Sequence, residues 1–118
     1  MSILAAIGWI IVGTAAVGVL ATFWDEVRQW LNSVAADFIE KHLGYSARQK
    51  MQKAVTCIDK VVNKIRNNSV IYTKKNNLDT YYDKTTILAE TSIYEIDQKV
   101  LNEINKRGEI VQEFEYRQ

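Results

Sequence analysis

Uncharged residues fill the beginning of the chain, where the stretch GWIIVGTAAVGVLATFW lies inside a longer apolar run. From Ile3 to Phe23 there are 21 consecutive residues without a charge. An α-helix of this length measures about 30 Å, which is the thickness of the hydrocarbon core of a bilayer. The run is apolar on all sides, whereas a helix at the surface of a small domain shows a polar face. The pattern therefore predicts a single transmembrane helix within residues 1–24.

Two other interpretations of this run stay open, a buried core helix and a cleaved export signal. Signal peptides begin with a basic region, but only Met1 and Ser2 precede the apolar run. Bases follow the run instead, beginning with Arg28 and Lys41. The positive-inside rule then predicts a protein of the cell inner membrane, with its N-terminus outside and its C-terminal body in the cytoplasm.

Small residues recur within the predicted span. Thr14, Gly18 and Thr22 are spaced four apart and form one ridge of a helix, and Gly8 and Gly13 continue the series of glycines. Small residues at this spacing let another helix backbone approach closely. We therefore predict that copies of the span pack against one another and form a homo-oligomer.

Two tryptophans, Trp24 and Trp30, stand directly after the span. Tryptophan is typical of the interface between membrane and water. The segment around them also has helical spacing, with an apolar stripe opposite a polar, acidic face. The stripe consists of Val27, Trp30, Leu31, Val34 and Phe38, and the acidic face includes Glu26, Asp37 and Glu40.

A further helix is predicted after Gly44, which is placed as a helix C-cap. Ser46 and Gln49 match a capping box at its start. Its apolar stripe comprises Met51, Ala54, Val55, Ile58, Val62 and Ile65, and its basic face comprises Lys53, Lys60 and Lys64. The two helices together make an amphipathic helical hairpin over residues 25–68, with an acidic face on one helix and a basic face on the other. These faces could pair within one chain, pair between copies or simply be solvated.

The period changes after residue 68. Residues 70–73 and 80–91 are rich in β-branched and aromatic side chains, which is typical of strands. Ser92 and Glu95 form another capping box, before a short helical pattern that Gly108 ends. Residues 110–117 then alternate between apolar and polar side chains. Residues 69–118 are therefore predicted to form a small α+β unit of the order β-β-α-β, which gains buried area by docking on another chain.

Charge is segregated along the chain. Residues 1–40 carry one base and four acids, residues 41–75 carry nine bases and one acid, and residues 76–118 carry five bases and nine acids. The basic stretch could be solvated or paired with other segments, or it could bind anionic lipid headgroups. Nucleic acid is the least favoured partner, because aromatic side chains are not interleaved with the bases.

The sequence offers little catalytic chemistry. His42 is the only histidine and lies near a predicted helix C-terminus, where its positive charge is favourable. Cys57 is the only cysteine and borders an apolar stripe, which favours a packed thiol over a nucleophile. No phosphate-binding loop and no zinc-protease motif is present. We therefore predict a protein that is not an enzyme and that needs no metal or cofactor.

Together these patterns predict a membrane protein of mainly α class, with a single transmembrane helix, an amphipathic helical hairpin and a small C-terminal α+β unit. The favoured function is self-association through the span, as in a pore-forming effector of the toxin or antiviral-defence type. One alternative is a membrane-anchored adaptor whose C-terminal unit recruits a protein partner. Another is an accessory subunit of a membrane complex.

Overall fold

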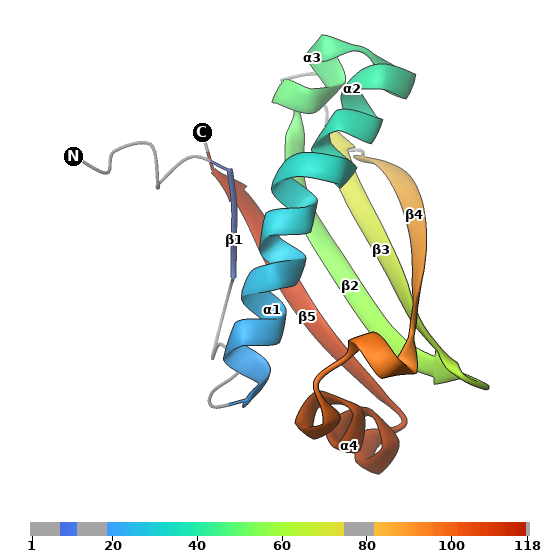
Figure 1. Ribbon diagram of the computed structural model, residues 1–118. Coiled ribbons are helices and arrows are strands. Elements are labelled where there is room, and N and C mark those ends of the chain that lie inside the picture. Colours follow the sequence, from blue (N-terminus) through green and yellow to red (C-terminus); the bar gives the residue numbers. More distant parts are fainter. Residues whose placement is uncertain (1–7, 12–18, 75–81, 118) are drawn as a thin grey trace.

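The computed structural model describes residues 8–11, 19–74 and 82–117, and these ranges form a five-stranded antiparallel sheet with helices against one face (Figure 1). The order across the sheet is β1-β5-β2-β3-β4, so the first strand of the chain pairs with the last. The strands are β1 Gly8–Ile11, β2 Met51–Val61, β3 Lys64–Lys74, β4 Tyr82–Ser92 and β5 Glu109–Arg117.

One long helical segment covers the inner face of the sheet. It consists of α1 (Val19–Trp30), a π-helical turn η2 (Leu31–Ala35) and α2 (Ala36–Leu43). Gly44 ends it with φ 96°, a conformation that glycine adopts without steric cost, and its N–H donates to the carbonyl of Glu40 at 2.9 Å. Three shorter helices are α3 Tyr45–Gln49, η3 Ile93–Glu95 and α4 Gln98–Arg107.

The hydrophobic core lies between the long helix and the sheet. The helix contributes side chains three or four residues apart, and each strand contributes alternate residues, because these two spacings place side chains on one face. Among the most deeply buried are Val27, Leu31, Ala35 and Ile39 of the helix, and Ala54, Ile58, Ile71 and Phe114 of the sheet. The first and last parts of the chain thus share one core.

The prediction of a transmembrane helix over residues 1–24 is wrong. Within that stretch the structure describes β1, whose Trp9 pairs with Tyr116 of β5, and the first part of α1. In the described part of the chain, no helix is both long and apolar enough to cross a bilayer. The predicted fold class, a membrane protein of mainly α structure, is therefore wrong as well. The predictions of a single-pass, pore-forming protein of the toxin or antiviral-defence type are wrong for the same reason. The uncharged residues of this stretch that the structure describes belong instead to an edge strand and to a helix that packs on the core.

The predicted helical hairpin over residues 25–68 is wrong in its second half. Residues 51–61 form β2, which pairs with β3 through a turn where Val62 has φ 57°. The sequence predicted a helix here because its apolar side chains are three or four residues apart. The alternation that is typical of a strand is hidden, because polar residues occupy some of the inward-facing positions. Thr56 and Ser69 point into the core with fully buried side chains, so the inner face of these strands is not continuously apolar.

The order of elements expected in residues 69–118 corresponds to β3, β4, α4 and β5. Ser92 caps the short η3, accepting a hydrogen bond from the N–H of Tyr94, and Asp97 caps α4 by accepting from Lys99. Gly108 ends α4 with φ 84°. Their strands are not all adjacent, however, because β2 lies between β5 and β3 in the sheet.

Candidate functional site

An open apolar cleft of about 180 Å³ lies between α1 and the inner face of the sheet, on the side of β3 and β4. It exists because the long helix lies closer to β1 than to β4, so that the inner face near β4 is only partly covered (Figure 1). Its apolar walls come from Phe23, Val27 and Trp30 of α1, and from Ile58, Ile65, Ala89 and Ile96.

Two uncharged polar residues with hydrogen-bonded side chains line the cleft: Asn67 of β3, and Thr91 of β4, whose hydroxyl donates to Glu95 Oε2 at 3.0 Å. The hydroxyls of Thr56 and Ser69 are 2.7 Å apart, and Ser69 Oγ donates to Asn67 Oδ1 at 2.6 Å. This chain of hydrogen bonds uses the amide oxygen of Asn67. Its amide N–H groups have no partner among the described residues, so they are available as donors to a bound molecule.

Carboxylates line the opening of the cleft. Glu26 of α1 belongs to its lining, and Glu90 of β4 also borders it, although its side chain lies on the outer face of the sheet. A second hollow of about 140 Å³ adjoins it and shares Phe23, Glu26 and Ile96, with Glu95 and Asp97 as further acids. In the described part of the chain, neither hollow is lined by lysine, arginine or histidine. The cleft therefore combines apolar walls with a negatively charged opening, to be called the acidic rim.

Of the residues predicted to pack the span, Gly13, Thr14 and Gly18 lie outside the described residues. Gly8 is the first residue of β1 and pairs with Arg117. Thr22 is exposed on α1 and lines the second hollow. The structure therefore does not bring the described members of this set together as one helix ridge.

The tryptophans expected at a membrane surface lie against the core. Trp24 is only 2% exposed, and its ring packs edge to face on Phe114 with centroids 6.2 Å apart. Trp30 is half-buried and forms part of the wall of the cleft. Both side chains therefore contribute to packing, and Trp30 also contributes to the candidate site.

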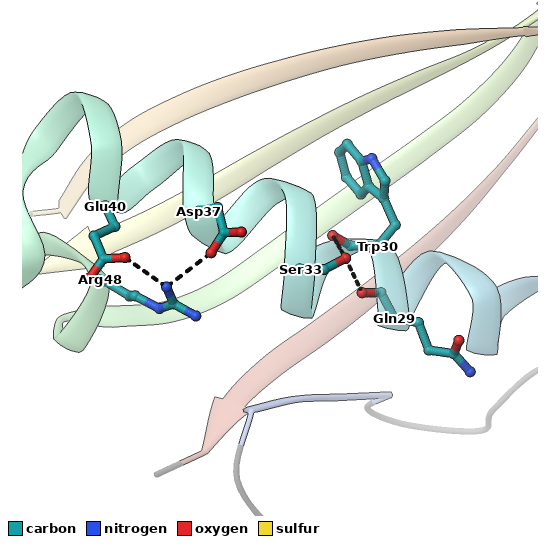
Figure 2. Close-up of polar contacts among 6 residues, drawn as sticks. All are labelled: Gln29, Trp30, Ser33, Asp37, Glu40 and Arg48. Atoms are coloured by element: carbon teal, nitrogen blue, oxygen red, sulfur yellow. Dashed lines mark hydrogen bonds and ion pairs between the residues drawn. The ribbon is translucent and has the colours of Figure 1, made fainter.

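The acidic face of the long helix is partly paired within the chain. Figure 2 shows Arg48 of α3 reaching across to α2, where its Nη1 lies 3.1 Å from Asp37 Oδ1 and 2.9 Å from Glu40 Oε2. In the same view Ser33, within the π-helical turn, donates its hydroxyl to the carbonyl of Gln29 at 2.9 Å. Glu26, in contrast, stands at the acidic rim.

The basic residues predicted on one helix lie on strands. The Nζ atom of Lys53, on β2, lies 3.5 Å from Glu113 Oε1 and 5.0 Å from the ring centroid of Tyr72. Lys60 and Lys64 are exposed at the ends of β2 and β3 next to their connecting turn. The separation of acids and bases in the sequence thus serves in part for pairing within one chain. A contact with lipid headgroups stays a prediction.

The two candidate reactive residues lie away from the cleft. His42 is exposed and packs against Phe38, with ring centroids 4.3 Å apart. Cys57 lies on the outer face of the sheet, where Sγ donates to Glu109 Oε2 at 2.9 Å. In the described ranges, no three histidine, cysteine or acidic side chains gather as they would around a metal ion.

Sequence reasoning missed the cleft because its walls come from four separate elements and from Ile96 in a connecting segment. The only local signal was the spacing of Phe23, Val27 and Trp30, which places three large side chains on one helix face. Compared with known protein families, characterised proteins and solved structures, the chain matches none of them. The function must therefore be argued from the geometry of this site.

Proposed function

We propose that this protein is a non-catalytic interaction module whose cleft holds one apolar side chain from a basic segment of a partner protein. The observation that carries the proposal is the combination of apolar walls and an acidic rim without a base in the described lining. The walls favour an apolar anchor, and the carboxylates favour positive charge on either side of it. The proposal keeps the adaptor function expected from the sequence and omits the membrane anchor.

The size of the cleft supports a single anchoring side chain. An enclosed cavity of about 150 Å³ in another protein accommodates benzene, and this cleft measures about 180 Å³. It therefore accommodates one aromatic ring or one leucine-sized side chain. Burial of such a side chain contributes roughly 1.5–3 kcal/mol, which is suited to a weak and reversible interaction.

Asn67 supports a peptide as the occupant. Its amide oxygen is engaged by Ser69, so its N–H groups can donate to a peptide carbonyl beside the anchor. A polar group precisely oriented within apolar walls is a common feature of ligand-binding clefts. Glu26 forms no ion pair in the described part of the chain, so a lysine or arginine bound beside it displaces no existing partner of this carboxylate.

The test uses a defined peptide, acetyl-Lys-Lys-Phe-Lys-Lys-amide, titrated into isotope-labelled protein and followed by amide chemical shifts. The expected result is a saturable change at Ile58, Asn67 and Ala89. A peptide with alanine in place of phenylalanine should bind about tenfold more weakly or worse, since it lacks the buried ring. Binding should also weaken as salt is added, because the rim attraction is screened.

Two matched variants locate the binding. Ala89→Leu places a larger side chain in the cleft and should weaken binding at least about tenfold. Val111→Phe makes a comparable enlargement on the outer face of the sheet and should leave binding unchanged. Equal binding of the two peptides, or equal loss in both variants, would contradict the proposal. The absence of enzymatic activity stays a prediction that this experiment does not address.

A further inference from the structure

The two edges of the sheet differ in how well they are protected. At one edge, β1 is described over four residues, and the N–H of its Trp9 donates to Asn32 Oδ1 of the long helix at 2.8 Å. At the other edge, β4 has 11 residues and pairs only with β3 among the described strands (Figure 1). Within the described residues, the outer edge of β4 therefore presents unpaired backbone groups along its length.

β4 lacks the features with which proteins usually block an edge strand, namely a bulge, a proline or a central charge. Its pairing with β3 runs without a register shift from Lys64↔Ser92 to Lys74↔Tyr82. The chain contains no proline, and between Thr85 and Thr91 the only charged residue is Glu90. Such an edge is a template for pairing with another strand.

We propose that the occupant of this edge is β4 of a second copy of the chain, paired antiparallel about a two-fold axis at Ile87. Ile87 is the middle residue of the strand Tyr82–Ser92. Pairing the strands over residues 82–92 therefore places Ile87 opposite Ile87, and joins the two sheets into one.

This register brings opposite charges together. Lys84 and Glu90 lie three residues on either side of Ile87, so Lys84 of each copy stands opposite Glu90 of the other. Side chains that are an odd number of residues apart in a strand lie on opposite faces of the sheet. Ile87 is buried on the inner face, so Lys84 and Glu90, each three residues away from it, both point to the outer face. In the described part of the chain neither forms an ion pair: Lys84 lies 5.5 Å from the ring centroid of Tyr72, and Arg66, beside Glu90, is held by Asp59.

Shifting the register removes this complementarity. Moving the axis to Leu88 places Lys84 opposite Ser92, and moving it to Thr86 places Lys84 opposite Leu88. Sliding one strand past the other by one residue would put inner residues opposite outer ones, which a continuous sheet does not allow. With the axis at Ile87, Leu88, which is 62% exposed, lies opposite Thr86 of the other copy and gains cover.

Charge reversal tests the pairing directly by sedimentation equilibrium over a range of concentrations. The unaltered chain of 13.6 kDa should associate to twice that mass. Lys84→Glu and Glu90→Lys each convert two attractive contacts into two repulsive ones, so each should raise the dissociation constant at least about tenfold. The double variant Lys84→Glu/Glu90→Lys restores opposite charges and should return to within about threefold of the unaltered chain.

The control is Lys99→Glu, which makes the same charge change on α4, away from the edge, and should leave association unchanged. Circular dichroism establishes that all variants are folded. The proposal would be overturned if the unaltered chain stays at 13.6 kDa up to millimolar concentration. It would also be overturned by a dimer whose dissociation constant is the same in both single variants, or by a double variant that is no better than either.

Discussion

At the scale of single residues, the Cys57 thiol illustrates how the sheet sets the chemistry of a side chain. The pKa of Cys57 is raised from its ordinary value of 9.0 to about 11, first by burial and further by the hydrogen bond and negative charge of Glu109. The nearby Arg66 lowers the pKa but does not compensate. Since the thiolate is the nucleophile, the thiol is held in its unreactive form at neutral pH.

The first prediction concerns Glu109→Gln. At pH 8.5, Cys57 of the unaltered protein should react with iodoacetamide about a hundredfold more slowly than a cysteine of ordinary pKa, because about two pKa units separate them. The variant should react faster, since it loses the charge that opposes ionisation, although burial still slows it. The measurement is the pH profile of alkylation, read by mass spectrometry.

Glu113→Gln is the control, because Glu113 lies on the same strand but does not bond to Cys57. An unchanged pH profile in Glu109→Gln would contradict the role of this carboxylate.

The raised pKa of Cys57 also affects the stability of the folded protein. Because the thiol has a higher pKa in the folded protein, its stabilising contribution is complete below about pH 9 and is lost as the pH rises towards about 11.

At the scale of the elements, β1 is the least supported strand. Among the described strands its four described residues pair with β5 alone, and the bond from Trp9 N–H to Asn32 Oδ1 ties it to the helix. Asn32→Ala leaves this partly buried N–H without its partner, at a cost of about 1–3 kcal/mol. We predict that hydrogen exchange at Trp9 accelerates strongly while exchange in β2 and β3 changes little.

Ser33→Ala provides the comparison for that prediction. Ser33 is exposed one position further along the same helix and bonds only to the helix backbone. Its loss should leave the exchange of Trp9 as it was. Equal acceleration across the whole sheet in Asn32→Ala would mean that the bond supports the entire fold and not the docking of β1.

The elements differ in how far the sequence could predict them. The helix ends at Gly44 and Gly108 and the alternating strand β5 follow from local rules, and the structure confirms them. β2 could not be recognised, because its inner face includes Thr56, whose polarity is satisfied by Ser69 from the neighbouring strand. That pairing joins residues 13 apart and leaves no local sign.

The face of the long helix was predicted only in part, for a different reason. Val34 and Phe38 continue the apolar stripe in the sequence, yet they are 55% and 37% exposed. The buried positions run through Leu31, Ala35 and Ile39 instead. The π-helical turn η2 lies at this point and alters the regular α-helical phase, which a fixed spacing does not anticipate. The cleft was missed for a related reason, since it depends on where this helix rests on the sheet.

At the scale of the whole molecule, the chain has one core to which distant segments contribute. β5 lies between β1 and β2, so the last strand is held by an early strand and by a middle one. Buried helix residues such as Leu31 and Ile39 come from the first part of the chain, and Phe114 comes from the last. Association of two copies through β4 would extend this sheet without disturbing the core, because the outer edge of β4 lies away from the long helix.

The last prediction follows from this arrangement and tests the division expected at residue 68. A fragment of residues 69–118 lacks β2, which pairs with both β3 and β5, and it also lacks the first five residues of β3. It also lacks the long helix and most of the core, and a chain of about 50 residues cannot bury enough surface to replace them. The fragment should therefore be unfolded by circular dichroism and amide chemical shifts. Mixed with residues 1–68, it should regain the spectrum of the intact chain, because the two pieces restore β2 between β3 and β5. A fragment 69–118 that folds alone would show that the C-terminal elements form an independent unit, contrary to the strand order.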